Sequence, residues 1–434
     1  MKVLEVRGPA RLDGRIEPPP DKSIAHRALI LSALAEGVCT IEPRPQGLDL
    51  GSTARVLTSL GIEVSTEGKG LRLVPNPLRP AGEVLDCGNS GTTARLMTGV
   101  LAGVPGLHEL DGDASLRRRP MERLRPLEAM GARFSGPSPL RLPFELEGQA
   151  ALVGRRTELG IASAQVKSAL LLAGLRAGGE TIVVEPGPSR DHSERMLRAL
   201  GVDLHTEPQG AGRIHRLRPS GRTWKGQRFL VPPDPSSAAF WLAAGVLSGG
   251  ELWVRTLLNP TRNGFLDGLV QAGCRLEKAE EVEIQGETVA WVRARVGSPS
   301  VLEWAGSDVI RSMDEIPILL GLMALGGGGR IRDAVELRHK ESDRLSAMAR
   351  MLTAMGHGVK EGPDGIEVEP GTHRPAEVDA EGDHRIALTA AVMALAARGW
   401  TRIRGAEVAD VSYPGFFETL TSLGVELRWS EPDR

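Results

Sequence analysis

A dense run of ionisable side chains occupies positions 338–345, which read RHKESDRL. Lys340 offers a compact positive charge, whereas Arg344 offers a planar fork that matches carboxylate and phosphate oxygens. Glu341 lies between them in the sequence and could exchange a proton with a substrate. Taken alone, the run is better explained as the solvated start of a helix, because exposed ion pairs are common.

The same run carries the signals of a helix N-terminus. Either Ser342 or Asp343 could cap the helix, and an apolar stripe follows at helical spacing. If Lys340 and Arg344 both lie in the first helical turn, their i, i+4 spacing makes them point the same way.

Short polar motifs of this kind recur before other helix-like segments. Each alone could be a turn, a capped helix or a solvated basic run. If a repeat brings these helix starts to one cleft, backbone N–H groups and cations converge there and favour a ligand with several negative charges. The motifs are DKSIAHR (21–27), GNSGTTAR (88–95), GDASLRRRP (112–120), SAQVKS (163–168), PSRDHSE (188–194), PDPSSAA (233–239), SMDEIP (312–317) and GDHR (382–385).

The chain contains six copies of one unit. In each copy, an amphipathic helix ends in an apolar residue plus glycine and leads into an alternating strand, and a second helix is apolar on nearly all sides and so must be buried. The pattern predicts an α/β protein with two domains of three units, 1–20 with 236–434 and 21–235, in which the N-terminal strand pairs with the second half. The closing glycines are Gly61, Gly131, Gly201, Gly273, Gly356 and Gly424.

Composition limits the function further. The 434 residues have a net charge of −2 and few aromatics, which argues against a nucleic-acid or membrane partner. Cys39, Cys87 and Cys274 are widely spaced, and no signal peptide, membrane span, P-loop, GxGxxG or HExxH motif is found, so a cytoplasmic protein without metal or nicotinamide is expected. The remaining candidate site consists of lysine and arginine side chains with one or two carboxylates. Such a site suits group transfer between small anions.

At these residues the sequence resembles the 5-enolpyruvylshikimate-3-phosphate synthase family (3-phosphoshikimate 1-carboxyvinyltransferases). The resemblance runs from end to end through DKSIAHRALILSALAEG, LDCGNSGTTARL, RRRPMERL, SAQVKSALLL, SMDEIPILL, RHKESDRL and GDHRIALTAAVMAL. It implies a two-domain inside-out α/β barrel in which each domain has three βαβαββ repeats. It also implies transfer of the enolpyruvyl group of phosphoenolpyruvate to the 5-hydroxyl of shikimate 3-phosphate, by addition and elimination of phosphate, in a monomer that needs no cofactor and no metal.

The resemblance also implies roles for individual residues. Lys22, Asp314 and Glu341 are the expected catalytic groups, with Asp314 accepting the hydroxyl proton and Glu341 giving a proton to the methylene. The family's contacts to shikimate 3-phosphate fall on Lys22, Ser23, Arg27, Ser163, Ala164, Gln165, Ser189 or Arg190, Asp314 and Lys340, and its contacts to phosphoenolpyruvate fall on Lys22, Gly91, Arg119, Arg344 and Arg385.

Four positions bear on these expectations. Ala164 replaces a frequent serine, so only its backbone can contact the ligand. Glu336 and Val411 replace residues that are often Asn and Lys in the family, and Glu336 is not expected to bind an anion directly. Gly91 leaves room beside phosphoenolpyruvate, which predicts inhibition by the analogue glyphosate.

Two other functions were weighed. The sister enzyme that transfers enolpyruvyl to UDP-N-acetylglucosamine uses a loop cysteine, whereas Ala114 or its neighbours stand at the corresponding place here. A non-catalytic polyanion-binding protein would fit the basic clusters, but the near-neutral charge and the embedded Asp314 and Glu341 oppose it.

Overall fold

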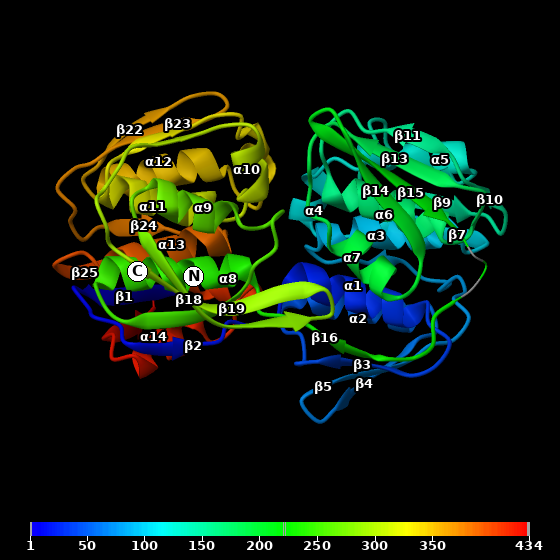
Figure 1. Ribbon diagram of the computed structural model, residues 1–434, viewed down its shortest axis with the longest axis horizontal. Coiled ribbons are helices and arrows are strands. Elements are labelled where there is room, and N and C mark those ends of the chain that lie inside the picture. The colour runs from blue at the N-terminus through cyan, green and yellow to red at the C-terminus, as the bar shows by residue number, and fades with distance from the viewer. Residues whose placement is uncertain (1, 220, 222, 432–434) are drawn as a thin grey trace. The chain divides into compact units, whose positions relative to one another are not determined.

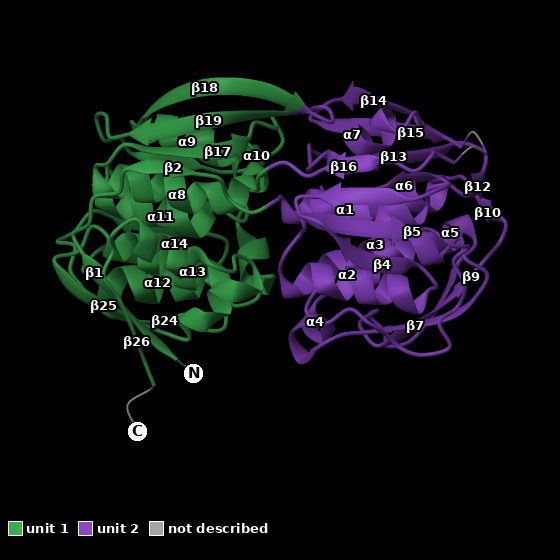
Figure 2. Ribbon diagram, turned by 90° about the horizontal axis from the view of Figure 1, so that it is seen from below, with its two compact units in different colours: residues 1–19, 233–283, 288–434 green, residues 20–232, 284–287 purple. Residues whose placement is uncertain are grey.

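The computed structural model describes residues 2–219, 221 and 223–431 (Figure 1). The chain forms two compact units, which Figure 2 colours separately. Unit 1 comprises residues 1–19, 233–283 and 288–434, and unit 2 comprises residues 20–232 and 284–287. No helix among the described residues is both long and apolar enough to span a membrane.

Within the described residues of unit 2, three four-stranded sheets share one pattern. An edge strand runs parallel to its neighbour, and the third strand is antiparallel to the second. A two-stranded pair, β10 (Leu152–Val153) and β12 (Ala177–Gly178), accompanies them. The sheets are β16 (Arg228–Leu230), β3 (Cys39–Glu42), β5 (Gly70–Val74), β4 (Glu63–Glu67); β6 (Leu85–Asp86), β7 (Gly106–Asp111), β9 (Phe144–Gly148), β8 (Arg133–Ser135); and β11 (Arg156–Glu158), β13 (Thr181–Glu185), β15 (Gly212–Arg218), β14 (Asp203–Gln209).

Unit 1 repeats this pattern in the sheets that the structure describes. Its edge strands are again parallel to their neighbours, and the third strands are antiparallel. The sheets are β2 (Gly14–Ile16), β17 (Leu252–Leu257), β19 (Glu287–Arg295), β18 (Arg275–Ile284); β20 (Leu302–Trp304), β21 (Gly329–Ile331), β23 (Ile366–Glu369), β22 (Gly358–Glu361); and β24 (Glu377–Asp379), β25 (Gly399–Arg404), β1 (Val3–Gly8), β26 (Leu427–Ser430).

The helices predicted to be apolar on all sides are buried. In unit 2, α3 packs on α6, and in unit 1 the helices α8, α11 and α13 pack on one another, so the helices form the interior of each unit. These helices are α1 (Lys22–Ala33), α3 (Gly91–Leu101), α6 (Ala164–Gly174), α8 (Pro235–Ser248), α11 (Ile316–Leu325) and α13 (His384–Ala394).

The amphipathic helices end as the sequence predicts. All six closing glycines have a positive φ, between 80° and 119°, which confirms the predicted left-handed turn after each helix. The helices are α2 (Leu48–Ser59), α5 (Pro126–Met130), α7 (His192–Ala199), α9 (Gly264–Gln271), α12 (Arg344–Ala354) and α14 (Phe416–Ser422). Shorter helices are α4 (Ala114–Arg118), α10 (Ser307–Arg311) and the 3₁₀ turns η1 (Glu122–Leu124), η2 (Val335–His339) and η3 (Ala406–Val411).

Three of the described sheets are completed by strands from distant parts of the chain, and one of these strands is β2, which pairs with β17. The expected pairing of the N-terminal strand with the second half is present, because β1 lies between β25 and β26. Similarly, β16 near the end of unit 2 pairs with β3 near its start. The predicted βαβαββ order is therefore complete in every repeat only when these strands from distant parts of the chain are counted.

The contact between α3 and α6 gives a stability prediction. A Cβ atom at Gly99 would lie 2.2 Å from the backbone oxygen of Ala169, so Gly99→Ala should push these helices apart and lower the free energy of unfolding by about 1–3 kcal/mol. Gly51→Ala is the matched control, because it lies in α2 and its Cβ would meet only the flexible end of Arg55 at 3.4 Å. Urea denaturation followed by circular dichroism should show a loss for the first variant and none for the second. Equal midpoints for both variants would contradict the close packing.

Candidate active site

The first turn of α1 presents Lys22. Asp21 caps this helix, because its Oδ1 accepts a hydrogen bond from the Ile24 N–H at 2.6 Å. The cap fixes the direction in which the next side chain leaves the helix. Lys22 Nζ lies 2.9 Å from Asp49 Oδ2, and its side chain is 27% exposed, so the ammonium group remains accessible to an anion.

Arg27 lies on the same helix but is nearly fully buried. Its Nε donates to Ser193 Oγ at 2.7 Å, and its Nη2 donates to Ser168 Oγ at 2.9 Å. Its Nη1 donates to the backbone oxygen of Ser23 at 2.9 Å. The guanidinium group is therefore held in one orientation by three neighbours, which is what a rigid anion site requires.

Gly91 and Arg119 lie together at the start of α3. Gly91 is the first residue of the helix, and a Cβ atom there would lie 3.5 Å from Arg119 Nη1 and 2.9 Å from Arg95 Nη1. Arg119 Nη2 donates to Asn89 Oδ1 at 2.7 Å. Two guanidinium groups thus border the place where the glycine has no side chain.

The start of α6 is joined to the start of α3. Ser163 caps α6, and Ala164 is its first residue. Gln165 accepts from Arg95 Nη1 at 2.5 Å and donates to Thr92 Oγ1 at 3.0 Å. The three residues predicted from this motif therefore occupy one half-buried helix turn.

Ser189 and Arg190 lie in the loop between β13 and α7. Ser189 is buried, and its Oγ donates to Glu185 Oε2 at 2.7 Å. Because a hydroxyl group has one proton, Ser189 presents lone pairs in its other directions. Arg190 is half-buried and carries donors only, so it is the better anion ligand of the two.

In unit 1, three carboxylates surround the guanidinium group of Arg344. Arg344 is 2% exposed, and its Nη2 lies 2.6 Å from Glu341 Oε2, while its Nε lies 2.8 Å from Asp383 Oδ2. Asp314 Oδ1 lies 3.5 Å from Arg344 Nη1 and 3.7 Å from Lys340 Nζ. The structure therefore brings together the four residues predicted from two separate motifs.

Asp383 ties Arg385 to the same group. Asp383 caps α13 and accepts from the Arg385 N–H at 2.8 Å. The Arg385 guanidinium carbon lies 5.7 Å from the centroid of the Phe240 ring. Burial alone would raise the pKa of the Asp383 carboxyl, but the charge and hydrogen bond of Arg344 together with the charge of His384 hold that pKa below its usual value.

The predicted helix start is confirmed, but Lys340 does not lie in the first helical turn. Residues 335–339 form the separate turn η2, and α12 begins only at Arg344, because Asp343 is its N-cap and accepts from the Ser346 N–H at 3.2 Å. Of the two suggested caps, Asp343 is the observed one. Lys340 lies outside the helix, so its approach to Asp314 comes from an extended linker rather than from i, i+4 spacing.

Comparison with known proteins identifies the family. The sequence model of the family described as EPSP synthase (3-phosphoshikimate 1-carboxyvinyltransferase) matches residues 6–420. The chain belongs to the EPSP synthase family. A 3-phosphoshikimate 1-carboxyvinyltransferase of Synechococcus sp. (strain RCC307) is 48% identical, covering 96% of this chain and 98% of the relative. One from Prochlorococcus marinus (strain MIT 9303) is 47% identical over 96% and 97% of the two chains.

Solved structures agree with this assignment. An EPSP synthase structure from Acinetobacter baumannii superposes with a TM-score of 0.87 at 33% identity, covering 99% of this chain and 100% of the other. This confirms the predicted α/β fold class of the enolpyruvyl transferases.

In this member of the EPSP synthase family, a buried polar cluster lies behind the loop of Ser189 and was not predicted. It consists of Lys167, Glu185, Glu194 and His215, of which Lys167 and Glu194 stand within quoted motifs but were given no role. The available signal was Lys167 itself, since a lysine inside an otherwise apolar helix must find a carboxylate. Of the unusual positions, Glu336 lies in η2 and Val411 ends η3.

The Asp383–Arg344 pair gives a pH prediction. Because the folded-state pKa of Asp383 is depressed, its contribution to stability is present above the unfolded-state pKa and is lost as the pH falls through the folded value. Asp383→Asn keeps a capping side chain but leaves Arg344 with less negative charge, so it should lower the free energy of unfolding by about 3 kcal/mol at neutral pH. The difference from wild type should shrink below about pH 4. Urea denaturation at several pH values tests this, and a difference independent of pH would contradict it.

Proposed function

We propose that Lys22, Asp314 and Glu341 are the catalytic groups of the reaction that defines this family. As a member of that family, the chain transfers the enolpyruvyl group of phosphoenolpyruvate to the 5-hydroxyl of shikimate 3-phosphate and releases phosphate, in aromatic biosynthesis. The observation that most supports these residue roles is the grouping of Asp314, Lys340, Glu341 and Arg344, which places two acids among cations.

The addition step needs a base and an acid. Asp314 is the proposed acceptor of the 5-hydroxyl proton as the hydroxyl oxygen attacks C2 of phosphoenolpyruvate. Glu341 is the proposed donor of a proton to the methylene carbon, which becomes a methyl group in the tetrahedral intermediate. Glu341 then takes a proton back from that methyl group as the C–O bond to phosphate breaks, so that the double bond forms again and Glu341 ends protonated, as it began. The hydroxyl proton held by Asp314 leaves with the released phosphate.

The cations have separate proposed tasks. The proposed side-chain contacts for shikimate 3-phosphate are Lys22, Ser23, Arg27, Ser163, Gln165, Arg190 and Lys340. The backbone of Ala164 is a further proposed contact, and Ser189 is the alternative to Arg190. Arg119, Arg344 and Arg385 are proposed for the phosphate and carboxylate of phosphoenolpyruvate, with Gly91 leaving space for it. Guanidinium groups suit this task because their paired N–H groups match two oxygens at once.

Compartment and assembly are also proposals. The three cysteines, Cys39, Cys87 and Cys274, are free thiols, which suits a reducing cytoplasm. A monomer is proposed, since a single chain supplies every residue named above.

The deciding experiment measures phosphate release. The purified chain should release phosphate from phosphoenolpyruvate only when shikimate 3-phosphate is present, and Glu341→Gln should lower kcat by about 100-fold or more, because an amide cannot transfer the proton. Binding of shikimate 3-phosphate by this variant, measured by calorimetry, is the control and should be close to wild type. Release that occurs equally with UDP-N-acetylglucosamine, or no release at all, would refute the proposal.

A second prediction concerns Gly91. Gly91→Ala places a methyl group 2.9 Å from Arg95 Nη1 and 3.5 Å from Arg119 Nη1, where phosphoenolpyruvate is proposed to bind. The KM for phosphoenolpyruvate and the inhibition constant of its analogue glyphosate should both rise, by about 10-fold or more, whereas the KM for shikimate 3-phosphate should stay within about twofold. Steady-state kinetics test this. A larger effect on shikimate 3-phosphate would show that Gly91 borders the other substrate.

A further inference from the structure

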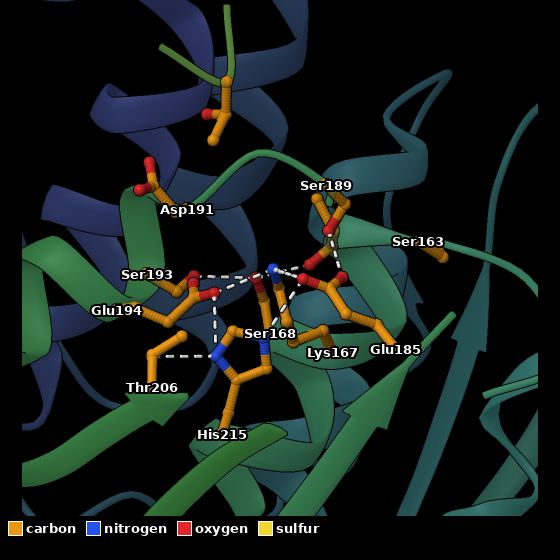
Figure 3. A network of polar contacts seen from close by, with 12 residues as sticks. Ser163, Lys167, Ser168, Glu185, Ser189, Asp191, Ser193, Glu194, Thr206 and His215 are labelled. Atoms are coloured by element: carbon orange, nitrogen blue, oxygen red, sulfur yellow. Dashed lines mark hydrogen bonds and ion pairs between the residues drawn. The ribbon is translucent and has the colours of Figure 1, made fainter. Parts of the chain in front are cut away.

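Lys167 is fully buried in the middle of α6, between two carboxylates. Its Nζ lies 3.0 Å from Glu185 Oε1 and 2.7 Å from Glu194 Oε1, and all three side chains are at most 1% exposed (Figure 3). Hydrogen bonding by His215 and the Lys167 charge outweigh the effect of burial and lower the pKa of Glu185 to about 2. The Glu185 carboxylate is therefore held in its charged form inside the protein, in contact with Lys167.

His215 completes the cluster. Its Nε2 lies 3.0 Å from Glu185 Oε1, and its Nδ1 lies 3.0 Å from Thr206 Oγ1 and 3.5 Å from Glu194 Oε1. Buried ionic groups are weak stabilisers, because apolar side chains of similar volume often serve as well. A contribution to stability therefore does not by itself explain why these charged side chains are buried together. The position of the cluster in the fold suggests a second role.

Both carboxylates flank the loop that carries the proposed phosphate ligands. Glu185 is the last residue of β13, and Glu194 lies in the first turn of α7, so Lys167 holds the loop 186–191 from both sides. Ser189, within this loop, donates to the second oxygen of Glu185 at 2.7 Å. One ammonium group thereby fixes the loop relative to α6.

Two serines next to Lys167 and Glu194 in the sequence bind Arg27. Ser168 follows Lys167 and Ser193 precedes Glu194, and the two hydroxyls lie 2.6 Å apart while each accepts from Arg27. Figure 3 shows these serines beside the buried cluster. Arg27, the loop and the first turn of α6 consequently share one support.

We propose that Lys167, with Glu185 and Glu194, positions the residues that bind the phosphate group of shikimate 3-phosphate. Lys167 is a positioning residue and touches no substrate. The inference rests on the proposed function of these phosphate-binding residues. It adds that the buried cluster of Lys167, Glu185 and Glu194 sets the spacing between them. Because donors must be placed within a fraction of an ångström of the phosphate oxygens, a small shift of the loop lowers affinity for that group in particular.

The test compares two ligands that differ only in the phosphate group. Lys167→Met in the full chain should weaken binding of shikimate 3-phosphate by about 10-fold to 100-fold, because the loop loses its anchor, while binding of shikimate changes by less than about twofold. Calorimetry measures both dissociation constants. The KM for phosphoenolpyruvate at saturating shikimate 3-phosphate should stay within about twofold of wild type, since Arg119 is held by Asn89, Arg344 by Asp383, and Arg385 lies over the Phe240 ring.

A charge-balanced variant separates positioning from stability. Lys167→Met combined with Glu194→Gln removes the excess negative charge and should recover most of the lost Tm, yet shikimate 3-phosphate should still bind weakly. His108→Gln is the control, because His108 is a buried polar residue of β7 whose Nε2 contacts only the backbone oxygen of Val104 at 2.9 Å. It should lower Tm without changing the ratio of the two dissociation constants.

Each other outcome overturns the inference. Recovery of affinity together with Tm in the double variant would show a purely structural role, as would equal weakening of both ligands. An unchanged dissociation constant for shikimate 3-phosphate in Lys167→Met would also refute it. Failure of the wild-type chain to bind shikimate 3-phosphate would instead refute the function proposed for the site.

Discussion

A positive charge removed from water must be met by negative charge, and this constraint shapes the interior of both units. In unit 1 the buried guanidinium of Arg344 contacts Asp383 and Glu341, and its pKa is raised further by these acids despite burial. In unit 2 the buried ammonium of Lys167 contacts Glu185 and Glu194. Since removing one partner leaves the other charge uncompensated, neither group can move without the elements that carry its partners.

Helix caps add to this constraint. Five of the six buried helices have a side-chain cap that accepts a backbone N–H, so their first turns are fixed before any ligand arrives. Ligand-binding candidates follow the cap within a few residues, as Lys22 follows Asp21 and Arg385 follows Asp383. The substrate groups are therefore expected to meet donors whose orientation the fold has already set.

Much of this was predictable from local sequence. The apolar helices and the glycines after the amphipathic helices follow from periodicity and from the conformational freedom of glycine, and both were predicted correctly. The cap of α12 was predicted as one of two neighbouring residues, and Asp343 is the observed one. The place of Lys340 outside the helix did not follow from spacing, because the separate turn η2 takes up the start of the charged run. The cluster around Lys167 was missed because its partners lie up to 48 positions away, on strands whose pairing no local pattern specifies.

The place of β1 in its sheet sets the order in which the protein can fold during synthesis. β1 leaves the ribosome long before β25 and β26, the strands with which it pairs, because their residues 399–404 and 427–430 follow late in the sequence. Unit 2, apart from the short segment 284–287, is complete by residue 232 and can acquire its core while translation continues. The N-terminal strand must meanwhile wait with open edges, and it needs protection from pairing with other nascent chains.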